Sequence, residues 1–174
     1  MSPATPKMAL PRPGVRSVLL GLAGFLLGAV AWLVLTGDRL PVLDAAGLEA
    51  ARGRWRASHI QDYRMTLVME GRELGKGSFE VVVRGGKAQS MTRDGAATGG
   101  DASAYTVDGL LDTLERELAM AADPQAALGA PAGYRAWLQA ELDPGTGLPR
   151  RFRRVVGGGG GKWVEWRVTR FERG

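Results

Sequence analysis

The chain contains 174 residues, of which 45% are hydrophobic and 24% charged, with a formal net charge of +5 and no cysteine. This length fits one modest domain with an additional segment, and the composition is that of a globular chain rather than a disordered or fibrous one. The absence of cysteine excludes disulfides, thiol chemistry, iron–sulfur clusters, zinc–thiolate sites and an acylated lipoprotein cysteine. The single histidine, His59, excludes a metal site that needs two imidazoles.

The first predicted element is an apolar segment over residues 17–37, which contain no charged residue. About 20 helical residues cross the ~30 Å hydrocarbon layer of a membrane. Lys7, Arg12 and Arg16 precede the segment without an acidic residue, and positive residues stay on the cytoplasmic side. We therefore expect a cytoplasmic segment over residues 1–16, a transmembrane anchor over 17–37 and a juxtamembrane connector over 38–43.

A cleaved signal peptide is the alternative interpretation of the same segment. Residues 29–31 read Ala-Val-Ala, which fits the small-x-small pattern of a cleavage site, although the apolar run continues beyond it. With an anchor, the protein is a single-pass protein of the inner or cytoplasmic membrane with its N-terminus inside. With cleavage near Ala31 it is secreted or periplasmic. Both interpretations export the remainder of the chain.

The apolar segment and its flank also account for much of the positive charge. They hold 3 of the 23 basic residues and none of the 18 acidic ones, which leaves a net charge of +2 for the rest. An exported domain of this charge does not present a phosphate-binding patch by default, so we expect no nucleic-acid partner.

The first half of the exported part predicts one helix and three strands. Residues 44–57 place Leu48, Ala51 and Trp55 on one helical face, with Asp44 as N-cap. Alternating apolar residues predict strands over 62–70, 78–84 and 87–93. A turn over 71–77 and a two-glycine hairpin at 85–86 separate these strands.

The second half repeats this order. After a loop over 94–104, Thr106 is expected to cap a helix whose apolar stripe contains Val107, Leu111, Leu114 and Leu118. A loop over 124–134 leads to strands over 136–142, 150–156 and 162–171, the last two joined by five glycines. The expected fold class is α+β: a transmembrane helix, then a two-layer extracytoplasmic domain over residues 44–174. In that domain the order helix-βββ-helix-βββ forms an antiparallel sheet with two helices on one face.

An ordered set of motifs resembles a family of uncharacterised small bacterial envelope domains of the secreted or lipoprotein type. The motifs are Trp55, residues 62–67, residues 79–83 before a Gly-Gly turn, residues 106–111 and residues 143–149. The resemblance covers residues 48–171. Family members often carry a cysteine pair after the first strand, which this chain lacks, and a helical Phe that is Leu110 or Leu111 here. The resemblance implies export and supports the fold, and it adds no catalytic residue.

Residues that could carry catalysis have simpler structural interpretations. His59 lies near Ser58 and Asp62, but sequence neighbours seldom form a triad, and a histidine at a helix end interacts with the last carbonyls. The pairs Asp108/Asp112 and Glu115/Glu117 fit the solvated face of their helix. No phosphate-binding or dinucleotide motif is present. We therefore expect no enzyme, no catalytic residue, no cofactor and no metal.

The candidate binding surface combines arginines with two tryptophans. On a strand, Arg151 and Arg153 share one face, while Phe152 on the core side draws Arg150 and Arg154 to the rim. The arginines predict an anionic partner. Alternatively, they belong to a solvated strand at the edge of the sheet, where charges discourage aggregation. Trp137 and Trp163 lie opposite the expected apolar faces, so they are exposed on the open sheet face or packed under loops.

The resulting functional hypothesis is a membrane-tethered, extracytoplasmic and non-enzymatic binding module of the bacterial envelope. Its partner would be an envelope protein, a glycan or a lipid, with the membrane contacted through residues 17–37. The alternative is a carrier of a lipid or another apolar ligand, in which Met65, Met69 and Met91 line a cavity well above ~300 Å³.

Overall fold

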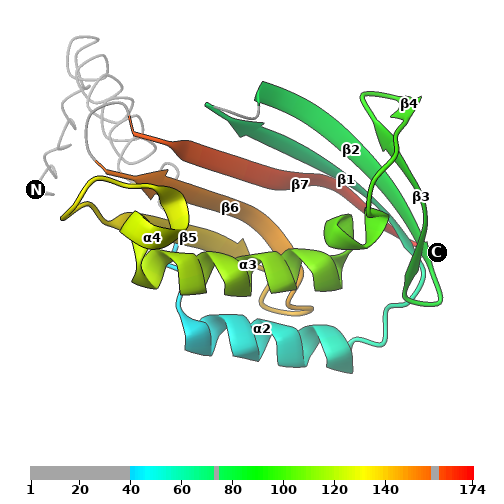
Figure 1. The fold of residues 1–174 in the computed structure, drawn as a ribbon. Coiled ribbons are helices and arrows are strands. Elements are labelled where there is room, and N and C mark those ends of the chain that lie inside the picture. Colours follow the sequence, from blue (N-terminus) through cyan, green and yellow to red (C-terminus); the bar gives the residue numbers. More distant parts are fainter. Residues whose placement is uncertain (1–39, 73–74, 158–160) are drawn as a thin grey trace, which may run out of the picture. The chain divides into compact units, whose positions relative to one another are not determined.

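The computed structural model describes residues 40–72, 75–157 and 161–174 (Figure 1). The segments expected over residues 1–16 and 17–37 lie outside the described residues. Within the described ranges, no helix is long and apolar enough to cross a membrane.

Most of the described chain belongs to one antiparallel sheet. The elements follow one another as α2 (Ala45–Ala57), β1 (Tyr63–Gly71), β2 (Gly75–Arg84), β3 (Lys87–Arg93), β4 (Ala96–Ala97), a 3-10 helix (Ala102–Tyr105), α3 (Val107–Ala122), α4 (Pro124–Leu128), β5 (Ala136–Leu142), β6 (Pro149–Val156) and β7 (Trp163–Arg173). The seven strands are arranged in the order β4-β3-β2-β1-β7-β6-β5. The last strand of the chain therefore pairs with the first, and β5 lies at one edge.

The expected fold class is wrong as stated. In the described residues the structure is a seven-stranded sheet with few helices rather than a helix-βββ-helix-βββ unit. The expected loop over 94–104 contains β4 and the 3-10 helix, and the expected loop over 124–134 contains α4. These elements are two to five residues long. A helix or strand is predicted from apolar residues that recur with its period, and elements this short contain too few residues to show that period.

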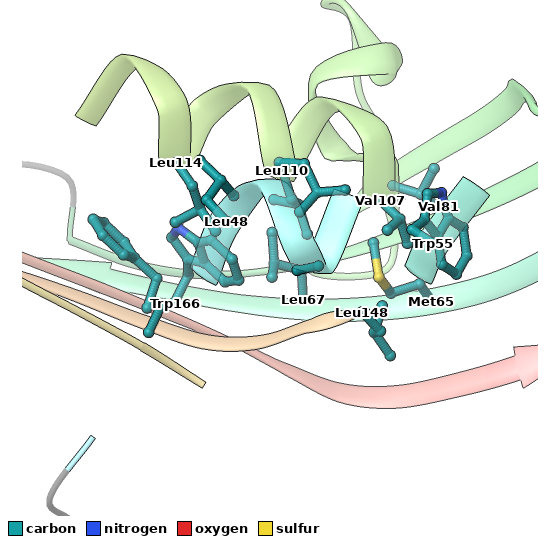
Figure 2. Packing of buried hydrophobic residues seen from close by; sticks show 14 of the residues in the cluster. Leu48, Trp55, Met65, Leu67, Val81, Val107, Leu110, Leu114, Leu148 and Trp166 are labelled. Atoms are coloured by element: carbon teal, nitrogen blue, oxygen red, sulfur yellow. The ribbon is translucent and has the colours of Figure 1, made fainter. Parts of the chain in front are cut away.

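One face of the sheet carries the core and is covered by α2 and α3 (Figure 1). Leu67 of β1 and Trp166 of β7 face Leu48 of α2 and Leu114 of α3 in Figure 2, and all four are nearly or completely buried. Each such side chain stabilises the fold by roughly 1.5–3 kcal/mol through burial. We call this side of the sheet the covered face.

The helix N-termini are capped as the sequence predicts. Asp44 accepts a hydrogen bond from the backbone N–H of Gly47 at 2.6 Å, and Thr106 accepts one from Gly109 at 3.1 Å. The hydroxyl of Tyr63 on β1 accepts a bond from the backbone N–H of Val107 at 2.9 Å, which joins α3 to the sheet. Burial raises the pKa of the Tyr63 hydroxyl to about 12.

The turn over residues 143–149 packs against α2. Gly147 has φ +78°, and a Cβ there would lie 2.0 Å from the carbonyl oxygen of Ala51. Asp143 accepts hydrogen bonds from the backbone N–H and the hydroxyl of Thr146 and from Arg150. The bond from the Thr146 N–H, followed by those from Arg150, lowers the pKa of this carboxyl to about 2. This motif, one of the five that carry the family resemblance, is thus a turn that docks on a helix.

Candidate binding surface

The second face of the sheet, which we call the open face, carries the candidate surface. Residues paired directly across antiparallel strands point to the same side of a sheet. Phe152 and Trp166 form such a pair on the covered face, so the residues that alternate with them point to the open face. The structure brings together there all four predicted site residues, Trp137, Trp163, Arg151 and Arg153.

The two tryptophans lie in one cross-strand row at the end of the sheet. Trp137 of β5 pairs with Val155 of β6, and Val155 pairs with Trp163 of β7. Trp137 is 54% exposed and Trp163 is 37% exposed. Because both side chains are exposed, the alternative in which both tryptophans pack under loops is wrong.

Val42 lies beside this row, at the edge of the sheet. It forms an isolated antiparallel bridge with Gln139, two residues along β5 from Trp137, and it is 77% exposed. We call Val42, Trp137, Val155 and Trp163 the aromatic patch. Tyr134 lies at the same corner, because a Cβ on Gly157 at the end of β6 would lie 2.0 Å from the Tyr134 ring.

The aromatic patch contains three of the four large hydrophobic side chains that are exposed in the described part of the chain, and the fourth is Tyr134. Isolated exposed hydrophobic residues are ordinary on protein surfaces, whereas a cluster of them marks an interaction site. Their gathering at one corner, where β5 and β7 begin and β6 ends, therefore selects this corner as the candidate site.

A cleft of about 500 Å³ opens along β5 at this corner. Its lining includes Val42, Trp137 and Val155 of the aromatic patch, and Leu118 and Ala121 of α3 on the covered side of β5. Its charged lining residue is Arg153. Ligand pockets typically measure about 300–1,000 Å³ and combine apolar walls with a few polar groups.

The two predicted arginines differ in their availability. Arg151 donates from Nε to Glu165 at 2.8 Å, and its side chain is only one-fifth exposed. Arg153 lies 3.9 Å from the same carboxylate, and its side chain is 47% exposed. Because Glu165 is engaged most closely by Arg151, Arg153 is the better placed of the two to meet an anionic group.

The neighbouring arginines on β6 have structural roles. Arg150 binds Asp143, and Arg154 donates from Nη1 to both carboxylate oxygens of Glu117 on α3 at 2.8 and 2.6 Å. The expectation that both arginines lie at the rim fits Arg150, whose side chain is exposed, but not Arg154, which is largely buried between β6 and α3. The expectation that Glu117 belongs to the solvated face of its helix is wrong, because the residue is 7% exposed and faces the sheet.

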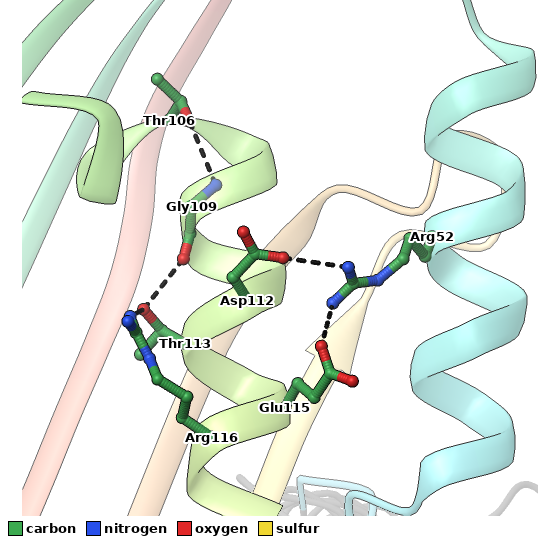
Figure 3. Close-up of polar contacts among 7 residues, drawn as sticks. All are labelled: Arg52, Thr106, Gly109, Asp112, Thr113, Glu115 and Arg116. Atoms are coloured by element: carbon green, nitrogen blue, oxygen red, sulfur yellow. Dashed lines mark hydrogen bonds and ion pairs between the residues drawn. The ribbon is translucent and has the colours of Figure 1, made fainter.

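One member of each expected acidic pair joins the two main helices. Arg52 of α2 donates to Asp112 at 2.9 Å and to Glu115 at 3.0 Å, both on α3 (Figure 3). Both carboxylates are well exposed. They therefore serve the contact between the helices at the rim of the core.

A second cleft, of about 560 Å³, lies between the 3-10 helix, the start of α3 and the β2–β3 hairpin. Asp101 at its rim accepts a hydrogen bond from the backbone N–H of Ser103 at 2.9 Å, and bonding to Ser103 lowers the pKa of this carboxyl. A general acid at neutral pH needs a raised pKa, so this carboxylate is tuned away from that role.

The other residues considered for chemistry lie apart from the aromatic patch. His59 is exposed with φ +51° directly after α2, and Ser58 donates its hydroxyl to the carbonyl of Trp55 at 2.7 Å. In the described ranges, no three His, Cys, Asp or Glu side chains are grouped so that they could hold a metal ion. Met65 and Met91 are buried in the core, and Met69 borders a pocket of about 140 Å³.

Sequence reasoning missed Val42 as part of the surface. The connector over 38–43 contains three aliphatic residues, and nothing in the sequence indicates that it pairs with the edge of β5. It also missed the apolar wall that Leu118 and Ala121 supply, because both residues fit the stripe expected to fill the core.

The chain matches no protein-family model and no curated protein. The resemblance to small bacterial envelope domains therefore stays a prediction that rests on the motifs named above.

Proposed function

We propose that this protein is a non-enzymatic binding module of the bacterial envelope, exported by its N-terminal apolar segment, and that the aromatic patch is its contact surface. The observation that carries the proposal is the exposed row of Trp137, Val155 and Trp163 beside a cleft in which Arg153 is the charged group. Tryptophan and arginine are the residues that most often supply binding energy at interfaces.

The chemistry of this corner defines a class of ligand. Apolar walls favour an aliphatic or aromatic group, and the exposed guanidinium of Arg153 favours an anionic group next to it. We therefore propose a ligand that carries both groups side by side. Arg151 has a supporting role, because it holds Glu165 and so leaves Arg153 available.

A photo-crosslinking amino acid placed at position 137 tests this proposal in the full chain expressed in bacterial cells. The matched control is position 90, because Ser90 is exposed on the open face at the diagonally opposite corner, paired with Val82 of β2. We expect adducts at position 137, fewer adducts when Arg153→Gln is added, and none above background at position 90. Equal adduct formation at both positions, or none at position 137, would contradict the proposal.

A carrier of a lipid or another apolar ligand is the second candidate, and the volume and apolar lining of the cleft along β5 favour it. A carrier retains its cargo through purification, whereas a docking surface does not. Native mass spectrometry of the full chain separates the two. Extra mass in a one-to-one ratio, lost in the Leu118→Asp variant, would support the carrier, and a bare chain would count against it.

A further inference from the structure

The aromatic patch lies beside the point at which the chain enters the domain. Residues 40–43 run along the outer edge of β5: the side chain of Gln139 donates to the carbonyl of Leu40 at 3.0 Å, and the backbone N–H of Leu43 donates to Leu138 at 3.0 Å. The N–H of Ala140 donates to Pro41 at 2.9 Å. These bonds fix Val42, the most exposed residue of the patch, at the start of the domain.

The sequence places an apolar run very close to this point. The uncharged residues 17–37 end at Gly37, five residues before Val42. Five residues in a fully extended chain reach at most about 18 Å. If residues 17–37 anchor the protein, chain length alone holds Val42 within about 18 Å of the bilayer surface. Because Val42 belongs to the aromatic patch, the same length of chain keeps the patch within reach of the lipid.

The residue types at this corner are those that favour the surface of a bilayer. Tryptophan prefers the layer between hydrocarbon and headgroups, where its ring is apolar and its N–H meets water. Two exposed cationic residues flank the row: Lys162 directly precedes Trp163, and Arg153 lies one row further along the sheet. Basic residues near an anionic membrane surface each strengthen attraction to it.

We infer that the aromatic patch docks this domain on an anionic lipid bilayer, with Trp137 and Trp163 in the headgroup layer and Arg153 and Lys162 against lipid phosphates. This inference rests on the proposed function and names the lipid surface as its ligand. The domain would then lie on the membrane with its sheet corner inward, and the opposite corner around Ser90 would face the aqueous side.

The absence of cysteine from the chain makes a direct test simple. The full chain is placed in nanodiscs of mixed phosphatidylcholine and phosphatidylglycerol, with one fluorophore at either Arg135→Cys or Ser90→Cys. Position 90 lies five strand spacings from β5, about 24 Å across the sheet. A nitroxide carried on the lipid headgroup should quench the label at position 135 and leave the label at position 90 bright.

Substitutions in the aromatic patch and at the neighbouring basic residues test which side chains are needed for docking. Trp137→Ser with Trp163→Ser should abolish the quenching at position 135. Arg153→Gln or Lys162→Gln should each weaken docking on the anionic nanodiscs about fivefold. Arg64→Gln, on the open face away from the patch, is the control and should change nothing. Far-UV circular dichroism and the melting temperature verify that each variant is folded.

The inference is overturned if the two labels are quenched equally, if neither is quenched, or if the double tryptophan variant is quenched like the parent chain. Failure of the proposed function is a separate outcome. Specific adducts to a protein or glycan at position 137, with no lipid quenching at position 135, would leave the binding module intact and remove the bilayer as its ligand.

Discussion

The covered and open faces of the sheet are formed by the same strands, since alternate residues point to opposite sides. On the covered face Met65 and Leu67 are completely buried beneath α2 and α3. On the open face ionic contacts predominate, such as Arg151 with Glu165, and large apolar side chains gather at one corner. The comparison shows that the core is complete without the aromatic patch, so the patch is available for a partner.

The largest expected difference between the two faces concerns stability. Leu67→Ala should lower the free energy of unfolding by about 2–5 kcal/mol, because it leaves a cavity in the core. Trp137→Ser removes a larger side chain that is 54% exposed and should change stability by less than about 1 kcal/mol. Urea unfolding of the two variants measures this difference. Similar losses in both variants would mean that the patch is part of the core.

The ion pair on the covered face should likewise contribute more to stability than the ion pair on the open face. Glu117→Ala leaves Arg154 unpaired between sheet and α3 and should cost about 3 kcal/mol. Glu172→Ala breaks the exposed pair with Arg170 and should cost between 0 and about 1 kcal/mol. Equal effects in urea unfolding would show that Arg154 and Glu117 do not hold the helix to the sheet.

The contact between Tyr63 and Val107 makes stability sensitive to alkaline pH. Tyr63→Phe leaves the Val107 N–H without its acceptor and should cost about 1–3 kcal/mol. Because folding raises the pKa of Tyr63 to about 12, its contribution is complete below pH 10 and is lost as the pH rises from 10 to 12.

The parent chain should therefore lose stability over this pH range more steeply than Tyr63→Phe does, as measured by unfolding midpoints at pH 8, 10 and 11.5. Tyr134→Phe, at the exposed corner, is the matched control and should leave the midpoint unchanged. Parallel pH profiles for the parent and Tyr63→Phe would contradict this assignment.

The turn at Asp143 gives the smallest expected effect. Folding lowers the pKa of Asp143 to about 2, so its contribution is present above pH 4 and is lost as the pH falls toward 2. Asp143→Asn should lower the melting temperature at pH 7. Near pH 2 the melting temperatures of the variant and the parent chain should differ less. A difference that is independent of pH would show that the carboxylate charge does not hold the turn.

The sequence predicts those parts of the structure in which a periodic pattern is long enough. The strand expected over residues 87–93 has these bounds in the structure, and Thr106 caps α3 as expected. The two-residue β4 and the five-residue α4 leave no such pattern. The placement of Trp137 and Trp163 on the open face follows from strand alternation.

Other features depend on contacts between distant parts of the chain. Val42 joins the patch because residues 40–43 pair with β5, almost one hundred residues later in the sequence. Glu117 looks like a solvated helix residue until β6 brings Arg154 next to it. Neither contact leaves a mark in the local sequence, so periodicity could not reveal them.

The most direct test of the central claim is the yield of photo-crosslinked adducts at position 137 compared with position 90 in the full chain. Both positions are exposed on the open face, and only position 137 belongs to the aromatic patch. We expect adducts at position 137 that decrease with Arg153→Gln, and only background at position 90. Equal yields at the two positions would contradict the assignment of the aromatic patch as the binding surface.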